Sequence, residues 1–357
     1  MFFVALAATV FFTSCDNSTN PIPEKVYSKV AYIVNYGNYS GSKSEISIYD
    51  TDSSSITHDA YKAANSVDFT SNIESIAVHK DIAYFMSNNG DKIDIVDAKS
   101  LQASVNPIST DITKPRYFAA DGSTAYISCW GDVDDWSVMA NSYIAKIDLT
   151  TNIVTKIALP GGPEGVIIIG NSLYVALTTT KKIAVIDLSN NDISYINTLA
   201  VPYHFVVDEA GYLWASMVST YTVPVGLDSV GLTQIDPATN TVLANVNFTD
   251  IGSNGFIHIS SDKKTVYVLG KEAWPGTASS IYSIDVPSQV LSNTALISGE
   301  KFNGFGINPE NDNIYVFISP SATENGSLKI YNSSGSLIDE EETGISPKHV
   351  VFYNIEQ

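Results

Sequence analysis

Positive charge and cysteine are both scarce in this chain of 357 residues. The 19 Lys and Arg residues are outnumbered by 38 Asp and Glu residues, which gives a formal net charge of −19 at pH 7. An acidic surface repels a phosphate backbone, so this balance disfavours nucleic-acid binding. The 2 cysteines are too few to build a disulfide scaffold.

Long apolar runs are missing as well. No stretch of 18 or more apolar residues occurs, so no transmembrane helix is predicted. Hydrophobic residues nevertheless make up 44% of the chain, 20 residues are tyrosine and only 16% are charged. This composition supports a large core and favours an all-β protein over a disordered one. The length allows two or three domains, although all-β units often run longer.

The N-terminus resembles a secretory signal. Residues 1–14 read MFFVALAATVFFTS and directly precede Cys15. A short apolar core that ends in small residues before a cysteine resembles a bacterial lipoprotein signal, in which that cysteine is acylated. We therefore expect a signal peptide at 1–14, a lipid anchor at Cys15 and a polar tether over 15–25. The alternative is a buried N-terminal strand over 1–14.

Cys129 is the second cysteine of the sequence. Acylation of Cys15 would leave it as the single thiol of the mature chain, without a disulfide partner. We therefore predict that Cys129 packs in the core, and a reactive thiol is the alternative.

The rest of the chain is built from a repeat. A β-rich run that ends at a turn-forming Asp or Asn occurs seven times between Asp50 and Asn332, with a mean spacing of 47 residues. Each copy predicts a strand, a tight polar turn and a second strand, because Asp, Asn, Ser and Gly favour turn geometry. The seven runs are 47–56, 94–103, 146–154, 185–193, 234–242, 283–291 and 330–338.

Two further strands precede these runs. The first is a short inner strand such as PRYFAAD at 115–121, and the second carries an aromatic residue followed by small or β-branched residues. We expect the seven aromatics to pack between neighbouring units and to identify the fold, not a site. They are Tyr32, Tyr84, Tyr126, Tyr174, Trp214, Tyr267 and Tyr315.

Four short antiparallel strands in about 47 residues are typical of one β-propeller blade. The region 26–61 lacks an inner strand, whereas 347–353 supplies an inner strand with nothing after it. Together they complete one blade. The sequence therefore predicts a single all-β domain over 26–357, a seven-bladed β-propeller of four-stranded blades. Its ring is closed by the C-terminal strand joining the N-terminal blade.

The starts of the inner strands supply the first set of candidate site residues, because they meet at one face of the central channel. His204 and His349 come from blades three steps apart and are expected to face each other, and Gly255 and Gly304 are expected to leave room. The charged members could instead form a plain ion-pair network around a wet channel. The candidates are Glu74, Arg116, Glu164, Tyr203, His204, Lys348 and His349.

Long loops after the aromatic strands, on the same face, supply the second set. Exposed aromatics beside amides and acids suit a large, flat, partly polar ligand such as a sugar or a macrocycle. The alternative is that these aromatics only cap the face. The loop candidates are Tyr36, Tyr39, Trp130, Trp136, Tyr221 and Trp274.

Motifs of catalysis and metal binding are missing from the sequence. It contains no phosphate-cradling Gly-rich loop, no HExxH, no CxxC pair and no GxSxG. The 5 histidines are not spaced like metal ligands, and the acidic DVDD at 132–135 lacks the rest of a calcium loop. We therefore predict no catalytic residue, no cofactor and no metal.

Four stretches carry a resemblance to a known family. The chain resembles the YncE-like, DUF5074-type seven-bladed propeller lipoproteins of Bacteroidota, which include the BtuG-type surface proteins that capture cobalamin. The resemblance spans nearly the whole mature chain, and PRY, GGPEG and GYLW are its most specific pieces. The stretches are VNYGNYSGSKSEISIYD at 34–50, KPRYFAADGSTAYISCWGD at 114–132, LPGGPEGVIIIGNSLYVALT at 159–178 and VVDEAGYLWASMVS at 206–219.

This resemblance implies a non-enzymatic binding protein that is lipid-anchored in the outer membrane and exposed at the cell surface. It would pass cobalamin or another large polar ligand to a TonB-dependent transporter. Two other classes stay open. Propeller lactonases have a similar fold, and in that case Arg116 would hold an oxyanion while Glu164 or His204 activated water. A protein-interaction scaffold would need no small ligand.

Overall fold

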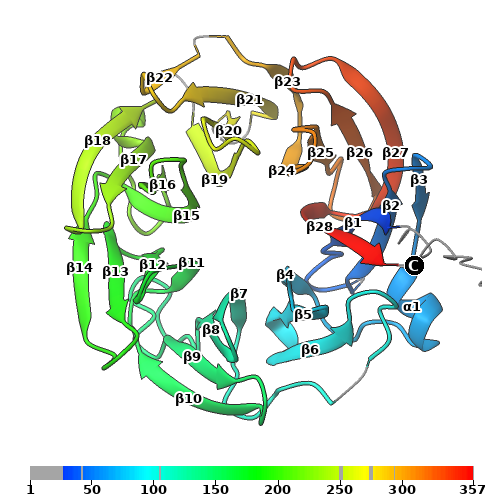
Figure 1. Ribbon diagram of the computed structural model, residues 1–357, viewed down its shortest axis with the longest axis horizontal. Coiled ribbons are helices and arrows are strands. Elements are labelled where there is room, and N and C mark those ends of the chain that lie inside the picture. Colours follow the sequence, from blue (N-terminus) through cyan, green and yellow to red (C-terminus); the bar gives the residue numbers. More distant parts are fainter. Residues whose placement is uncertain are drawn as a thin grey trace, which may run out of the picture.

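The computed structural model describes residues 27–41, 43–103, 106–248, 252–272, 276–292 and 294–356. The expected signal peptide at 1–14, Cys15 and the tether lie outside these residues. Figure 1 shows seven antiparallel sheets arranged in a ring around a central axis, which confirms the predicted seven-bladed β-propeller. Within the described residues, no helix is both long and apolar enough to cross a membrane.

The first blade joins the two ends of the propeller. Its inner strand is β28 (Pro347–Glu356), which pairs antiparallel with β1 (Tyr27–Asn35). The sheet continues outward through β2 (Glu45–Asp50) and β3 (Ser55–Thr57). The first and last strands of the domain therefore share one sheet, as predicted, and this pairing closes the ring (Figure 1).

The second blade departs slightly from the four-stranded plan. It contains β4 (Ile73–His79), β5 (Ile82–Ser87) and β6 (Lys92–Asp97), and the helix α1 (Ala60–Asn65) precedes it. In place of an outer strand, two isolated bridges link Ala103 to Val96 and Ile108 to Ile93. A 3-10 turn, η1 (Asn88–Gly90), connects β5 to β6.

The other five blades each run outward from an inner strand. In the sixth blade both β22 and β23 pair with β21, so its outer position is shared by two strands. The short η2 (Leu227–Ser229) lies between β16 and β17. The strands are β7 (Pro115–Asp121), β8 (Thr124–Cys129), β9 (Tyr143–Asp148), β10 (Ile153–Ala158), β11 (Pro163–Ile169), β12 (Ser172–Leu177), β13 (Lys182–Asp187), β14 (Ile193–Asn197), β15 (Val201–Val207), β16 (Leu213–Val218), β17 (Gly231–Asp236), β18 (Thr241–Asn247), β19 (Gly252–Ile259), β20 (Thr265–Lys271), β21 (Ala278–Asp285), β22 (Val290–Leu291), β23 (Ile297–Glu300), β24 (Phe302–Ile307), β25 (Ile314–Ile318), β26 (Asn325–Tyr331) and β27 (Leu337–Ile345).

The core lies between the blades. The described residues form seven buried apolar clusters, one at each seam between neighbouring blades. The seven repeated aromatics are all buried in these seams, as predicted. Tyr174 of the fourth blade, for example, packs against Leu213 and Ala215 of the fifth. Each aromatic therefore joins one blade to the next, which explains why the repeat requires it.

The predicted Asp turns are also present. The Asp148 carboxylate accepts the Thr150 N–H at 2.8 Å, and Asp50 and Asn332 accept equivalent N–H groups in their own turns. These bonds hold the hairpin in turn geometry. The Thr150 backbone N–H lowers the pKa of Asp148 by stabilising the ionised carboxylate.

Cys129 is wholly buried at the end of β8, in the seam between the second and third blades. Burial raises the pKa of this thiol to about 12, so it stays protonated at neutral pH. We expect iodoacetamide at pH 8 to label Cys129 slowly in the native protein and rapidly in urea, as followed by peptide mass spectrometry. Equal labelling rates in the two conditions would contradict the packing role.

Candidate functional site

The inner strands begin with a local irregularity that turns polar side chains toward the channel. The antiparallel register shifts between Ile73 and Ser75, and likewise after Pro115, Pro163 and Pro202. A bulge re-aims the side chains that it contains, and a proline at the strand start removes one backbone donor from the ladder. Glu74, Arg116, Glu164, Tyr203 and His204 all lie within these shifts.

Serines of neighbouring blades hold these bulges in place. The Ser128 hydroxyl donates to the Glu164 carbonyl at 2.6 Å, and the Ser216 hydroxyl donates to the Gly255 carbonyl at the same distance. Ser75 donates in the same way to the Arg116 carbonyl. Each bond crosses from one blade to the inner strand of the next. The sequence patterns did not single out these serines, although Ser128 and Ser216 each lie two residues after the repeat aromatic of their blade, which was a usable signal.

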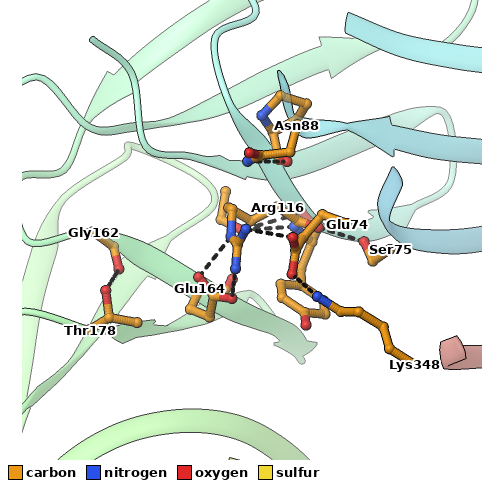
Figure 2. Close-up of polar contacts among 11 residues, drawn as sticks. Glu74, Ser75, Asn88, Arg116, Gly162, Glu164, Thr178 and Lys348 are labelled. Carbon is orange, nitrogen blue, oxygen red and sulfur yellow. Dashed lines mark hydrogen bonds and ion pairs between the residues drawn. The ribbon is translucent and has the colours of Figure 1, made fainter. Parts of the chain in front are cut away.

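Four charged side chains form a continuous network at the channel mouth, as Figure 2 shows. The Arg116 guanidinium donates Nη2 and Nε to the two Glu164 oxygens at 2.5 and 3.0 Å. Its Nη1 lies 2.8 Å from Glu74 Oε2, and Lys348 Nζ lies 2.5 Å from Glu74 Oε1. The network therefore links the second, third, fourth and first blades.

Arg116 is the only arginine in the sequence, and every other basic residue except histidine is a lysine. A guanidinium has a planar fork of donors that can bind two carboxylates at once, which a lysine ammonium cannot do in the same geometry. Arg116 is only 5% exposed and Glu164 is fully buried. The single arginine thus stands where a buried, two-sided fork is needed.

Burial raises the pKa values of the two network carboxyls, whereas their ion pairs lower them. Burial by itself would raise the pKa of Glu74, but Arg116 and Lys348 outweigh it and lower that pKa to about 2. At Glu164 burial outweighs the ion pair with Arg116 and raises the pKa. The Glu74 pairing therefore stabilises the fold above pH 4.5, and this stabilisation is lost as the pH falls through about 2.

Aromatic rings fill the channel beside this network. The His204 ring stacks on Phe256 at 5.2 Å and meets the edge of Tyr117 at 4.7 Å. Tyr117 also contacts His349 at 6.3 Å, so it lies between the two histidines that the sequence placed across the channel. The sequence patterns did not point to Tyr117 or Phe256, although both lie at or next to the repeat position of His204.

The two glycines of this layer do not leave free room, and that expectation was wrong. A Cβ on Gly255 would lie 2.4 Å from Cδ1 of Tyr203, and one on Gly304 would lie 2.1 Å from the Lys348 carbonyl oxygen. Glycine is required here because a ring and a neighbouring backbone already occupy the space. These two positions therefore open no space for a ligand inside the channel.

Three histidines of the inner strands are kept neutral. Burial lowers the pKa of His258 and of His349 to about 4, and it lowers the pKa of His204 well below its usual value. The folded state therefore loses stability as the pH falls from 6.5 toward 4, because the histidines of the unfolded chain take up protons first. In the described part of the chain, no group of three or more His, Cys, Asp or Glu side chains is arranged to hold a metal ion.

The third-blade loop places two tryptophans over the network. The Arg116 guanidinium lies 3.9 Å from the centre of the Trp130 ring, a cation–π contact, and Trp136 meets Trp130 edge to face at 5.8 Å. Trp136 is 55% exposed. The Trp130 indole N–H is buried and has no hydrogen-bond partner among the described residues.

The acids of DVDD order this loop. The Asp135 carboxylate accepts the Ser137 N–H and hydroxyl at 2.8 and 2.6 Å, and Asn141 donates to the Asp134 carboxylate at 3.1 Å. Gly131 has φ +67°, and a Cβ there would lie 2.3 Å from the Asn141 carbonyl oxygen. Local turns therefore account for these residues and fix the tryptophan pair above the channel.

The first-blade loop contacts the network at Lys348. Lys348 Nζ lies 5.1 Å from the centre of the Tyr36 ring, and burial raises the pKa of Tyr36 to about 12. Tyr39 and Tyr221 are well exposed and lie outside this cluster of contacts. Trp274 lies outside the described residues. The structure thus joins Tyr36, Lys348, Glu74, Arg116, Glu164, Trp130 and Trp136 into one chain of contacts.

The chain belongs to the family described as "Domain of unknown function (DUF5074)", whose model matches residues 29–345. This match covers nearly all of the propeller and confirms the coarser part of the predicted resemblance. A comparison with the curated proteins gave no match.

Several solved structures share the fold. A quinonprotein alcohol dehydrogenase-like protein from Bacteroides thetaiotaomicron superposes with a TM-score of 0.67 at 14% identity, covering 90% of this chain and 78% of its own. The periplasmic gluconolactonase of Pseudomonas aeruginosa superposes with a TM-score of 0.65 at 15% identity, and the match covers 91% of this chain and 99% of the gluconolactonase. Hydrazine synthase of Kuenenia stuttgartiensis superposes with a TM-score of 0.65 at 15% identity, and the match covers 80% of this chain and 95% of the matched hydrazine synthase chain. At such low identity these likenesses show the propeller fold alone.

Proposed function

We propose that this protein is a non-enzymatic ligand-binding propeller that captures a large, flat, partly polar molecule on its loop face. The observation that carries the proposal is the pair of tryptophans above the buried network. Trp130 is fixed by Arg116, Trp136 is exposed beside it, and the buried Trp130 indole N–H has no acceptor. A buried donor without a partner is costly, and a ligand that brings an acceptor removes that cost.

The chemistry of this face favours a macrocycle with amide arms. Exposed aromatic rings bind flat surfaces by stacking, while indole N–H groups donate hydrogen bonds and phenol groups donate or accept them. Tyr36 and Trp136 come from different loops; Tyr36 contacts Lys348, and Trp136 lies against Trp130. Cobalamin has a wide ring with amide side chains, so it is the ligand that we propose first.

Binding, not catalysis, is also what the charged residues support. A lactonase mechanism at this site would need Arg116 free to stabilise an oxyanion and a free Glu164 oxygen to activate water. The guanidinium is already shared by two carboxylates, and both oxygens of Glu164 accept from it. These contacts suit a rigid floor beneath a binding site.

The proposal includes a place in the cell. A lipid on Cys15 would anchor the protein in the outer membrane, where it would present the loop face to ligand and pass it to a TonB-dependent transporter. The lipoprotein-like sequence at 1–14 supports the anchor. Metabolic labelling with an alkyne fatty acid tests it, because a Cys15→Ser variant should lose the label that the parent chain carries.

Calorimetric titration of the purified protein with cyanocobalamin tests the ligand assignment. We expect a single saturable site with micromolar or tighter affinity, because stacking on rigid, pre-positioned rings costs little ordering entropy. The absence of heat and of any spectral change at tens of micromolar would end the cobalamin proposal. Detectable lactone hydrolysis that Glu164→Gln abolishes would favour the enzyme class instead.

A further inference from the structure

A separate cavity of about 410 Å³ opens at the seam between the seventh and first blades. Its wall comes from the ends of β1 and β27, the start of β2 and the segments at 58–59 and 68–69. Figure 1 shows β27 and β2 next to each other in this part of the ring. The volume lies within the range of small-molecule sites.

One wall of this cavity carries a buried acceptor with no donor. Asn35 is 0% exposed, lines the cavity, and its Oδ1 has no hydrogen-bond partner among the described residues. The orientation of its amide is fixed by its neighbours. The Ser47 hydroxyl donates to Glu45 Oε1 at 2.7 Å, so it accepts from Asn35 Nδ2 at 2.9 Å, and Nδ2 also donates to Glu45 at 2.6 Å. Reversing the amide would set two acceptors against each other.

The cavity is also strongly negative. Glu45, Asp59, Asp68 and Glu342 line it, against Lys43 as the single lysine of the lining. Asp68 is paired at its edge with Lys62 at 2.9 Å. The remaining carboxylates leave an excess of negative charge around the Asn35 acceptor. Such a site favours a ligand that carries both positive charge and N–H donors.

Two further features narrow the class of cation. The described residues contain no group of three His, Cys, Asp or Glu side chains that could hold a metal ion, so a bare metal is disfavoured. Phe69, which is buried in the core, also lines the cavity and supplies an apolar surface. An alkyl chain with a primary ammonium group matches both parts, because the chain packs on the ring while the ammonium donates to oxygens.

We infer that this cavity is a second binding site, specific for a small organic cation with a primary ammonium group. The ammonium donates to Asn35 Oδ1 and is held by the charges of Glu45 and Glu342. This site lies at a blade seam, apart from the tryptophan pair at the channel mouth. It is therefore independent of the cobalamin proposal, and either one can fail alone.

Titration with 1,5-diaminopentane tests this inference on the full chain. We expect saturable 1:1 binding that weakens as NaCl rises from 50 to 500 mM, while pentan-1-ol of the same chain length does not bind. The primary ammonium group could belong to a free amine or to a lysine side chain of another protein. Titration with Nα-acetyl-lysine methylamide tests the lysine side chain. Equal binding of pentan-1-ol, or no binding of either amine at 10 mM, overturns the inference.

Two substitutions locate the site. Glu342→Gln removes a charge from the cavity wall and is expected to weaken diaminopentane binding by up to about fivefold. Glu341→Gln is the matched control, because successive residues of β27 point to opposite faces of the sheet. Asn35→Ala, with folding checked by circular dichroism, is expected to abolish binding. Equal effects of the two Gln variants would overturn the assignment.

Discussion

Replacing Arg116 with methionine is expected to lower the free energy of unfolding by roughly 3–5 kcal/mol at pH 7. Removing one partner of a buried ion pair leaves an uncompensated charge, and here two carboxylates lose the same guanidinium. Urea denaturation measures the effect. Arg116→Lys is the matched control, since it keeps the charge but loses the fork, and its loss should be smaller.

The pH dependence of this variant has a defined sign. Without Arg116, burial raises the pKa of Glu164 further, and at Glu74 only Lys348 still opposes burial. Both carboxyls therefore take up protons more readily in the folded variant than in the folded parent protein. The difference in the free energy of unfolding between the parent protein and the variant should therefore shrink as the pH falls from 7 to 4. The three neutral histidines destabilise both proteins over this range, and the comparison removes their contribution. An equal deficit at both pH values would contradict the buried-network account.

Replacing Trp136 with alanine is expected to weaken ligand binding roughly tenfold or more, because exposed aromatic anchors carry much of the binding energy at recognition sites. The stability of the protein should hardly change, since Trp136 is 55% exposed and contacts the fold mainly through Trp130. Calorimetric titration with cyanocobalamin and a urea curve measure the two quantities.

Tyr195→Ala is the matched control for this substitution. Tyr195 is also a well-exposed aromatic, but it lies on β14, the outer strand of the fourth blade. Its loss should leave cyanocobalamin affinity unchanged. If Trp136→Ala and Tyr195→Ala bind the ligand equally well, the tryptophan pair is not the binding surface and the aromatics only cap the face.

The fold was predictable because the residues that recur in each repeat have local physical roles. Asp and Asn fix the turns by hydrogen bonds within a few residues, and the aromatics Tyr32 to Tyr315 fill equivalent seams. The closure of the ring followed from a missing inner strand at one end and a spare one at the other. The outer positions of two blades departed from the four-stranded plan. In the second blade the pairing is reduced to two bridges, and in the sixth blade β22 and β23 share the position.

The candidate site was predictable only in part. The positions of Glu74, Arg116 and Lys348 at the inner-strand starts indicated that they meet, but not which charges pair. The glycine expectation failed because whether Gly255 leaves a cavity depends on the rotamer of Tyr203 in the neighbouring blade. The cavity at Asn35 depends on contacts across the ring closure, between residues some 300 positions apart in sequence, such as Asn35 and Gly344.

The most direct test of the binding account is a titration followed at the tryptophan indole N–H signals by NMR. On addition of cyanocobalamin, the signals of Trp130 and Trp136 should move together and saturate at one equivalent. The signal of Trp214, which is buried between blades and donates to Asp208 at 2.8 Å, should stay in place. Unmoved Trp130 and Trp136 signals at saturating ligand would contradict the proposal that the loop face is the binding site.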